Sequence, residues 1–170
     1  MALEARPVSA SRVRLARVMQ VTDANNLGNV HGGVVMREVD NAAGMAAARH
    51  AGHAAVTAGI DELSFRAPVY VGDLLIVEAS VNAVGRTSME VGVRVEAEDW
   101  KGGERRHTTS AYLVFVAIDG DGNPVEIPPL KTETDEERRR EAQAQIRRQV
   151  RKERIARIGE WRPEPTDLGG

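Results

Sequence analysis

The hydrophobic period of this chain changes near residue 52, and this change limits the folds that the chain can adopt. Residues 33–50 repeat apolar side chains with the period of an amphipathic helix. Strand-like segments with a period of two then dominate, and tight turn sequences separate most of them. One strand before the helix and four after it are expected over residues 12–21, 55–66, 74–84, 88–99 and 107–119. This order predicts an α+β fold, in which one antiparallel sheet packs against one mostly apolar helix.

The expected helix has one broad apolar arc built largely from small residues. The arc contains Val35, Met36, Val39, Ala42, Ala43, Ala46 and Ala47. Charged residues such as Arg37 and Glu38 fall on the other side, and Gly52 is the expected stop. The clearest strand, residues 88–99, also has one apolar face. That face contains Met89, Val91, Val93, Val95 and Ala97.

Composition narrows the chemistry that the chain can perform. The 170 residues suffice for one ordinary domain, and 42% of them are hydrophobic. The absence of cysteine excludes disulfides, thiolate metal sites and a cysteine nucleophile, and it fits a reducing compartment. No segment has the length and apolarity of a membrane span, and the first residues lack the apolar core of a signal peptide. We therefore expect a soluble, cytoplasmic protein.

The C-terminal part differs in charge from the rest of the chain. Residues 131–162 contain eleven Lys and Arg against seven Asp and Glu, whereas the whole chain has a net charge of −2. A second helix is expected over residues 133–158, with Thr134 as its N-cap and acidic residues in its first turn. Its few apolar positions predict a solvated or interface helix: Ala142, Ile146, Val150, Ile155 and Ile158. The expected organisation is a domain over 1–130, a charged helical extension over 131–160 and a flexible tail over 161–170.

Asp40 is the first candidate for chemistry. It lies at the border of the apolar arc rather than among the charged residues, one turn from Met36, Ala43 and Gly44. A carboxylate beside an apolar face costs free energy unless it is paired or used, and small neighbours leave room for a ligand. The alternative is an Asp that caps a neighbouring loop or forms an ion pair at an interface.

The glycine-rich sequence GNVHGG, residues 28–33, leads directly into the helix. Backbone N–H groups at a helix start have no partners within the helix, so they can bind an anion or polarise a carbonyl oxygen. The alternative is a tight strand-to-helix turn. The loop is not a Walker loop, because no Gly-Lys-Ser/Thr follows, and its glycine spacing differs from the dinucleotide-binding pattern.

The sequence gives no support for several other chemistries. It has no Gly-x-Ser-x-Gly motif of a serine nucleophile. Its four histidines show no metal-ligand spacing, so no metal is expected. The segment 119–123 begins like a calcium loop, but Pro124 and Leu130 stand where Gly and Glu are needed, which favours a plain turn. The basic helix carries no aromatic residue among its charges, which disfavours nucleic-acid binding.

Three stretches in the same order resemble one known family. They are DANNLGNVHGGVVMREVDNAAGMAAARHAG, SFRAPVYVGDLL and GRTSMEVGV. Together they resemble the hot-dog-fold acyl-CoA thioesterases. The resemblance is strongest to the bacterial YciA-type enzymes and to the mammalian tandem-domain cytosolic acyl-CoA hydrolase. The resemblance covers about residues 12–130. It implies the hot-dog fold, in which a curved antiparallel sheet wraps around one long central helix, and a dimer. It also implies hydrolysis of acyl-CoA to a free acid and CoA without a metal or an organic cofactor.

The resemblance assigns roles to residues of the first stretch. Asp40 matches the catalytic carboxylate of the central helix, acting as general base or as nucleophile. Asn29 matches an asparagine that helps to hold the water or the thioester, and backbone N–H groups around Gly32 and Gly33 would polarise the thioester carbonyl. One active site in this family draws on two subunits. Asn29 of one chain is therefore expected to face Asp40 of the partner subunit.

CoA binding is assigned by the same resemblance to His31 and to Arg86, Thr87 and Ser88. A homodimer is implied, and family members often assemble as trimers of dimers; neither nucleic acid nor a membrane is an expected partner. Three alternatives stay open. The chain could be a thioesterase for acyl-carrier-protein or aryl thioesters, a hot-dog protein that binds acyl-CoA without turnover, or a nucleic-acid-binding module built on the basic helix.

Overall fold

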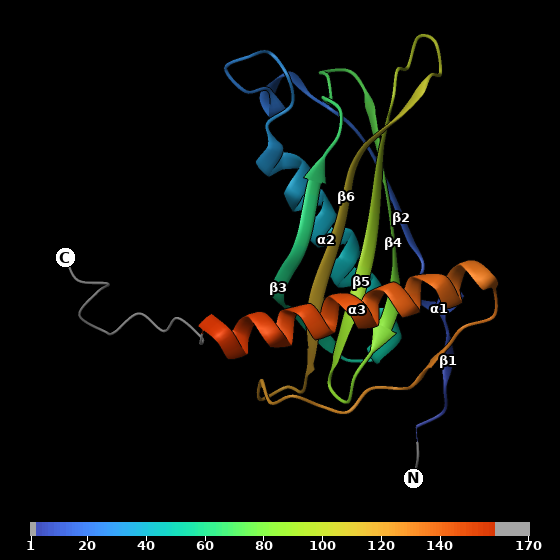
Figure 1. The fold of residues 1–170 in the computed structure, drawn as a ribbon. Coiled ribbons are helices and arrows are strands. Elements are labelled where there is room, and N and C mark those ends of the chain that lie inside the picture. Colours follow the sequence, from blue (N-terminus) through green and yellow to red (C-terminus); the bar gives the residue numbers. More distant parts are fainter. Residues whose placement is uncertain (1–2, 159–170) are drawn as a thin grey trace.

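A five-stranded antiparallel sheet curves around one long helix in the computed structural model, which describes residues 3–158 (Figure 1). The strands lie in the order β2-β4-β5-β6-β3. Their bounds are Val13–Val18 for β2, Ala54–Phe65 for β3, Leu74–Val84 for β4, Ser88–Glu98 for β5 and Arg105–Ile118 for β6. The helix α2 spans Gly32–Ala51. The predicted hot-dog arrangement is confirmed, while the tail expected over residues 161–170 lies outside the described residues.

Small side chains let α2 lie close against the curved sheet. Four of its core alanines have no exposed surface: Ala42, Ala43, Ala46 and Ala47. At Gly44 an added Cβ would lie 3.6 Å from the ring of Phe115. Gly52 ends the helix with a φ of 73°, a left-handed conformation that favours glycine. Met36 was expected in the core but is 40% exposed, because it lies at the border of the arc where the sheet does not cover α2.

The predicted inward face of β5 is also confirmed. All five of its apolar residues are buried: Met89, Val91, Val93, Val95 and Ala97. They form one core cluster with the buried side of α2. The alternation of apolar and polar residues therefore fixes which face of the sheet meets the helix.

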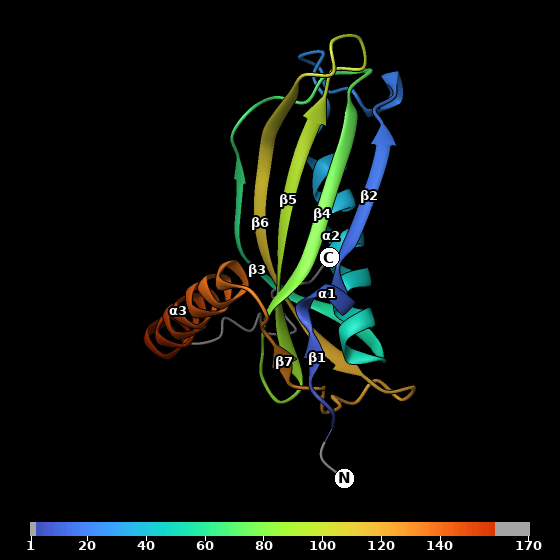
Figure 2. The same ribbon diagram turned by 90° about the vertical axis from the view of Figure 1, so that its right-hand side faces the viewer.

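Four short elements carry no periodic signal and were not anticipated. They are β1 (Arg6–Pro7), α1 (Val8–Ser11), the 3-10 helix η1 (Val21–Asp23) and β7 (Leu130–Lys131). β1 pairs in parallel with β7, and the two lie side by side in Figure 2. The pair holds the beginning of the described chain beside the segment that leads into the last helix.

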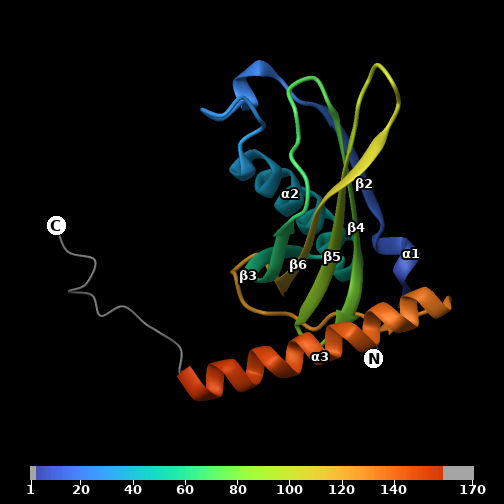
Figure 3. The same cartoon turned by 45° about the horizontal axis from the view of Figure 1, so that its top comes forward.

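The helix α3 (Asp135–Ile158) crosses the outer face of the sheet, opposite to α2 (Figure 2, Figure 3). The predicted N-cap is present, because Thr134 Oγ1 accepts the N–H of Glu137 at 3.2 Å. The carboxylate of Glu137 in turn accepts the N–H groups of Glu133 and Thr134. These bonds satisfy donors that a helix start leaves open.

Ion pairs rather than apolar contacts hold most of α3 on the sheet. Ile146 and Val150 face solvent, with 65% and 58% of their surface exposed. On the side toward the sheet, Arg147 pairs with Glu90 of β5 at 2.7 Å, and Arg151 pairs with Asp61 of β3. Within residues 3–158 no helix combines the length and the apolarity needed to cross a membrane.

Candidate active site

Asp40 lies about two turns into α2, beside the edge strand β3. Its Oδ1 accepts a hydrogen bond from Thr57 Oγ1 of β3 at 2.6 Å, and both residues are exposed in the single chain. Within residues 3–158 no side chain or backbone group donates to Oδ2. A carboxylate that is held at one oxygen and open at the other can take a proton from water.

The edge of β3 beside Asp40 is uncovered in the single chain. β6 lies on one side of β3, and no strand of the described chain lies on the other. Four apolar side chains beside this edge are 40–53% exposed: Val56, Ile60 and Phe65 of β3 and Met36 of α2. Proteins seldom leave a long apolar edge strand open, because its unpaired backbone groups bind other chains. This side of the molecule therefore has the character of an interface.

The start of α2 is capped by a residue of the glycine-rich loop itself. His31 is the N-cap, and its Nδ1 accepts the N–H of Gly33 at 2.9 Å. The predicted use of the Gly33 N–H toward a thioester carbonyl needs correction, because the imidazole already occupies that donor. The Gly32 N–H has no acceptor within residues 3–158, so it is the donor that a ligand could reach.

Two asparagines shape the loop before α2. Asn25 Oδ1 accepts the N–H groups of Leu27 and Asn29 at 2.8 and 3.2 Å, and the Asn25 N–H donates to the Asn29 carbonyl at 2.7 Å. The side-chain NH₂ groups of both asparagines have no acceptor in the described part of the chain. No hydrogen bond there joins either one to Asp40. A single chain thus does not connect the predicted pair of Asn29 and Asp40.

Charged groups anchor the same loop to β2 and α2. Arg17 donates to both carboxylate oxygens of Asp23 at 2.9 Å and to Glu38 Oε1 at 3.1 Å. The backbone N–H of Gln20, together with Arg17, holds the pKa of Asp23 below its usual range. The Asp23 carbonyl then accepts the His31 N–H at 2.8 Å. This network positions the loop against the first turns of the helix.

The predicted CoA-binding residues do not come together in one chain. Arg86, Thr87 and Ser88 lie at the turn between β4 and β5, whereas His31 lies at the opposite end of the sheet (Figure 1). Arg86 is 79% exposed, and its guanidinium lies 3.4 Å from Glu126. A site that used both groups of residues would need two chains.

A cavity lies on the other face of the sheet, beneath α3. It has a volume of about 580 Å³ and is lined mainly by polar and charged side chains, including Ser110 and Arg94. Ser110 Oγ lies 2.9 Å from His107 Nε2, but Arg94 donates to His107 Nδ1 at 3.3 Å. An arginine can only donate, so Nε2 carries the proton of the neutral ring and cannot activate the serine. Within residues 3–158 no group of three His, Asp or Glu side chains is arranged to hold a metal ion.

Sequence reasoning did not single out Thr57, which contacts Asp40, or Asn25, which shapes the loop before α2. Thr57 is a polar residue within an apolar strand, and its contact with Asp40 depends on how β3 packs beside α2. Asn25 stands in a turn-rich stretch, where asparagine commonly serves the turn alone. Neither residue therefore carried a signal that separates a site from ordinary structure.

Comparisons with known proteins agree with this architecture. Residues 27–103 match the family model of the Thioesterase superfamily. An uncharacterized acyl-CoA thioester hydrolase of Bacillus subtilis, YkhA, is 39% identical over 125 residues, which are 74% of this chain and 72% of YkhA.

Two solved structures share the fold along nearly the whole chain. The apo form of a hexameric acyl-CoA thioesterase is 40% identical with a TM-score of 0.88, and the match covers 91% of this chain and 99% of that one. An acyl-CoA hydrolase from Staphylococcus aureus, solved with butyryl-CoA, CoA and CoA disulfide, is 32% identical with a TM-score of 0.83, over 89% and 93% of the two chains. The same enzyme has also been solved with alanine in place of one asparagine, one aspartate or one threonine.

Proposed function

The chain belongs to the thioesterase superfamily, and on that basis we propose that it hydrolyses the thioester bond of acyl-CoA to a carboxylic acid and CoA. The observation that carries the proposal is the Asp40 carboxylate, which Thr57 holds at one oxygen and which is open at the other. The names of the relatives and the butyryl-CoA bound by the Staphylococcus aureus enzyme support CoA as the carrier.

Residue spacing supports a trio of Asn25, Asp40 and Thr57 for this chemistry. In the Staphylococcus aureus enzyme, the replaced aspartate lies fifteen positions after the replaced asparagine, and the replaced threonine lies seventeen positions after that aspartate. Asn25, Asp40 and Thr57 have the same two separations. The spacing favours Asn25 over Asn29, four residues later, as the amide that binds the water or the thioester carbonyl.

In the proposed reaction Asp40 acts as the general base. Its open oxygen takes a proton from a water molecule while the water oxygen attacks the thioester carbonyl carbon. The Gly32 N–H, at the positive end of α2, is suited to donate to the oxyanion that forms. When the C–S bond breaks, the proton on Asp40 passes to the sulfur, and CoA leaves as the thiol. Thr57 keeps the carboxylate in one orientation throughout.

We further propose that the open edge of β3 pairs with the same edge of a second copy. The loop that carries Asn25 and Asn29 would then complete the site around Asp40 of the partner subunit. The uncovered apolar side chains of β3 support this arrangement, and the hexameric relative supports further assembly into a trimer of dimers. One chain has both halves of the site, so a homodimer would hold two equivalent sites.

Release of free thiol from a panel of short- to long-chain acyl-CoAs tests the proposal. Wild type should turn over at least one substrate, and Asp40→Asn should lose roughly two or more orders of magnitude in kcat, as expected for a positioned acid–base group. Asp121→Asn makes the same change at an exposed position after β6, so it is the matched control and should retain activity. If no acyl-CoA is cleaved, the same assay should be run with acyl-carrier-protein and aryl thioesters as substrates. Binding of CoA without cleavage of any thioester would indicate a non-catalytic acyl-CoA-binding protein.

A further inference from the structure

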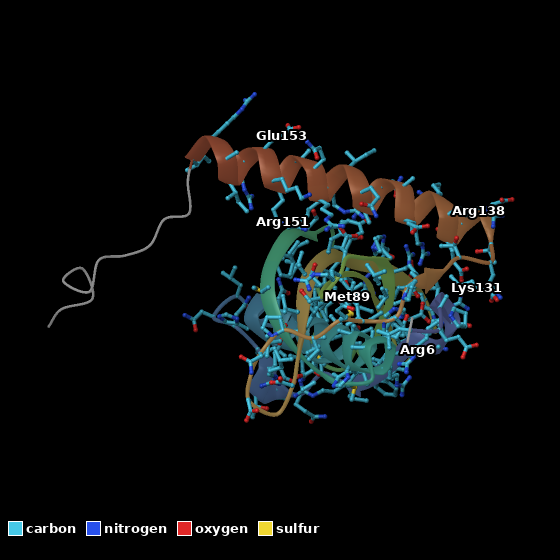
Figure 4. The ribbon with its side chains drawn as sticks, turned by 90° about the horizontal axis from the view of Figure 1, so that it is seen from below. Arg6, Met89, Lys131, Arg138, Arg151 and Glu153 are labelled. Carbon is cyan, nitrogen blue, oxygen red and sulfur yellow. The ribbon has the colours of Figure 1, made fainter. Side chains whose placement is uncertain are left out.

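The cavity beneath α3 lies apart from the candidate active site. Its volume of about 580 Å³ is in the range of small-molecule pockets. The outer face of the sheet forms its floor, and residues 136–147 of α3 contribute its roof. Figure 4 shows α3 across the sheet with side chains between them, Arg151 on the side toward the sheet and Glu153 on the far side. Asp40 belongs to α2, which packs against the opposite face of the sheet (Figure 2), so the proposed hydrolysis does not use this cavity.

Two buried side chains of β4 present unpaired polar atoms to the cavity floor. Ser80 is 8% exposed and Asn82 is 4% exposed, and both line the cavity. The NH₂ group of Asn82 donates to the Glu90 carboxylate at 3.1 Å; a carboxylate only accepts, so this contact leaves Asn82 Oδ1 as a free acceptor. Neither Asn82 Oδ1 nor Ser80 Oγ has a hydrogen-bond partner within residues 3–158. Buried polar atoms are normally paired, so these two atoms indicate a partner from outside the chain.

Gly92 of β5 keeps this part of the floor open. It lies directly across from Ser80 in the sheet. A Cβ added at Gly92 would lie 2.5 Å from Asn82 Nδ2 and 3.0 Å from Asn82 Oδ1. Any larger residue would therefore cover or displace the amide, whereas glycine leaves its oxygen accessible from the cavity.

Positive charge is in excess around the cavity. Six arginines line it, and five glutamates pair with them in the described part of the chain. The arginines are Arg12, Arg14, Arg94, Arg139, Arg140 and Arg147, and the glutamates are Glu78, Glu90, Glu96, Glu136 and Glu137. Glu136 is shared, because Arg139 donates to both of its oxygens and Arg140 Nε donates to one of them at 2.9 Å. Both Nη groups of Arg140 thus have no acceptor within residues 3–158.

We propose that this cavity binds a small phosphorylated sugar or polyol. The phosphate binds the Arg140 guanidinium, whose planar fork matches two phosphate oxygens. The hydroxyl groups donate to Asn82 Oδ1 and exchange hydrogen bonds with Ser80. Tyr112, the aromatic residue on the cavity wall, already stacks 3.6 Å from the Arg147 guanidinium, which favours a hydroxylated ligand over a planar base. This inference goes beyond the proposed function and does not rest on it.

Calorimetric titration of the full chain with glycerol 3-phosphate, ribose 5-phosphate and glucose 6-phosphate tests the proposal. At least one of them should bind, and the matching unphosphorylated compound and inorganic phosphate should each bind roughly tenfold more weakly. Arg140→Gln should raise the Kd roughly tenfold, as expected for loss of hydrogen bonds to a charged group, and Ser80→Ala should raise it about threefold. Arg138→Gln is the matched control, because Arg138 pairs with the exposed Asp135 and does not line the cavity. It should leave the Kd unchanged.

Two further measurements place the ligand and keep the test independent of folding. Thermal unfolding of the ligand-free variants should match that of wild type, and the ligand should slow hydrogen exchange in residues 136–147. The proposal is rejected if none of the three phosphates binds, or if Arg140→Gln changes the Kd no more than Arg138→Gln does. Equal affinity for inorganic phosphate would reject recognition of the hydroxyl groups, and displacement of the ligand by CoA would reject a separate site. Thiol release is not measured in these experiments, so the proposal can fail while the proposed function stands.

Discussion

Replacing Glu90 by glutamine should weaken the attachment of α3 to the sheet, whereas replacing Glu136 by glutamine should not. Both glutamates accept hydrogen bonds from arginines of α3. Glu90 accepts from Arg147 at 2.7 and 3.0 Å and from Asn82 at 3.1 Å, and its side chain is 6% exposed. Glu136 also accepts three such bonds, at 2.7–2.9 Å, but half of its side chain is exposed.

Exposure decides the size of the two effects. Removing one partner of a buried ion pair costs about 3–5 kcal/mol. In Glu90→Gln the new amide keeps one acceptor, and Arg147 is 19% exposed and stacks 3.6 Å from the centre of the Tyr112 ring, so we expect a loss of about 2 kcal/mol. Arg139 and Arg140 lower the pKa of Glu136 to about 2, yet water screens so exposed a pair. Glu136→Gln should therefore leave the stability unchanged.

Urea unfolding of wild type and both variants measures the difference in free energy. All three should be compared at one protein concentration, because assembly shifts the apparent stability. Hydrogen exchange then locates the change, which should be largest in residues 135–158. Equal unfolding free energies for the two variants would refute the argument that burial, rather than the number of hydrogen bonds, anchors α3.

Three other predictions concern the active site, pH and packing. Thr57→Val should lower kcat about tenfold in the thiol-release assay, as expected for the loss of one hydrogen bond to a charged group, while Thr57→Ser should retain most activity. An equal loss in both variants would exclude the hydroxyl as the cause. Burial lowers the pKa of His50 from 6.5, so the unfolded state binds the proton more readily and stability should fall as pH drops below that value. Thermal unfolding across this pH range should show a shallower dependence of Tm on pH for His50→Gln than for wild type. Gly92→Ala should destabilise the fold by about 1–3 kcal/mol, because the added Cβ would lie 2.5 Å from Asn82 Nδ2. The control is Gly120→Ala, whose added Cβ would meet no atom within 4 Å and whose thermal denaturation should match that of wild type.

The sequence was sufficient for the elements whose apolar residues recur with a clear period. The buried alanines of α2, the stop at Gly52 and the inward face of β5 all follow from periodicity and from the conformational freedom of glycine. Periodicity did not show which face of α3 meets the sheet, because its few apolar residues such as Ile146 and Val150 face solvent. Two ion pairs orient this helix. Arg147 lies 57 positions after its partner Glu90, and Arg151 lies 90 positions after its partner Asp61, so no local sequence pattern predicts these contacts.

The candidate site could be predicted only where one residue conflicted with its surroundings. Asp40 stood out because a carboxylate at the border of an apolar arc needs an explanation. Thr57 did not, because its partner lies across the boundary between helix and strand. The capping of Gly33 by His31 is local, but Nδ1 of a histidine is not among the usual N-cap acceptors. The sequence therefore predicted both Gly32 and Gly33 as donors, whereas only the Gly32 N–H is open within residues 3–158.

The strand order also has a consequence for synthesis of the chain. β3 pairs only with β6 in the described sheet, from Ala54 with Ile118 to Phe65 with Thr109. A ribosome therefore completes β3 well before its pairing partner emerges, whereas β4, β5 and β6 can pair with their neighbours in turn. Until then α2 also lacks β6 and a fixed position for β3, which together cover part of its apolar face. Long-range pairing is slow and leaves apolar surface exposed, so the nascent chain is most prone to aggregation before residue 118 is made.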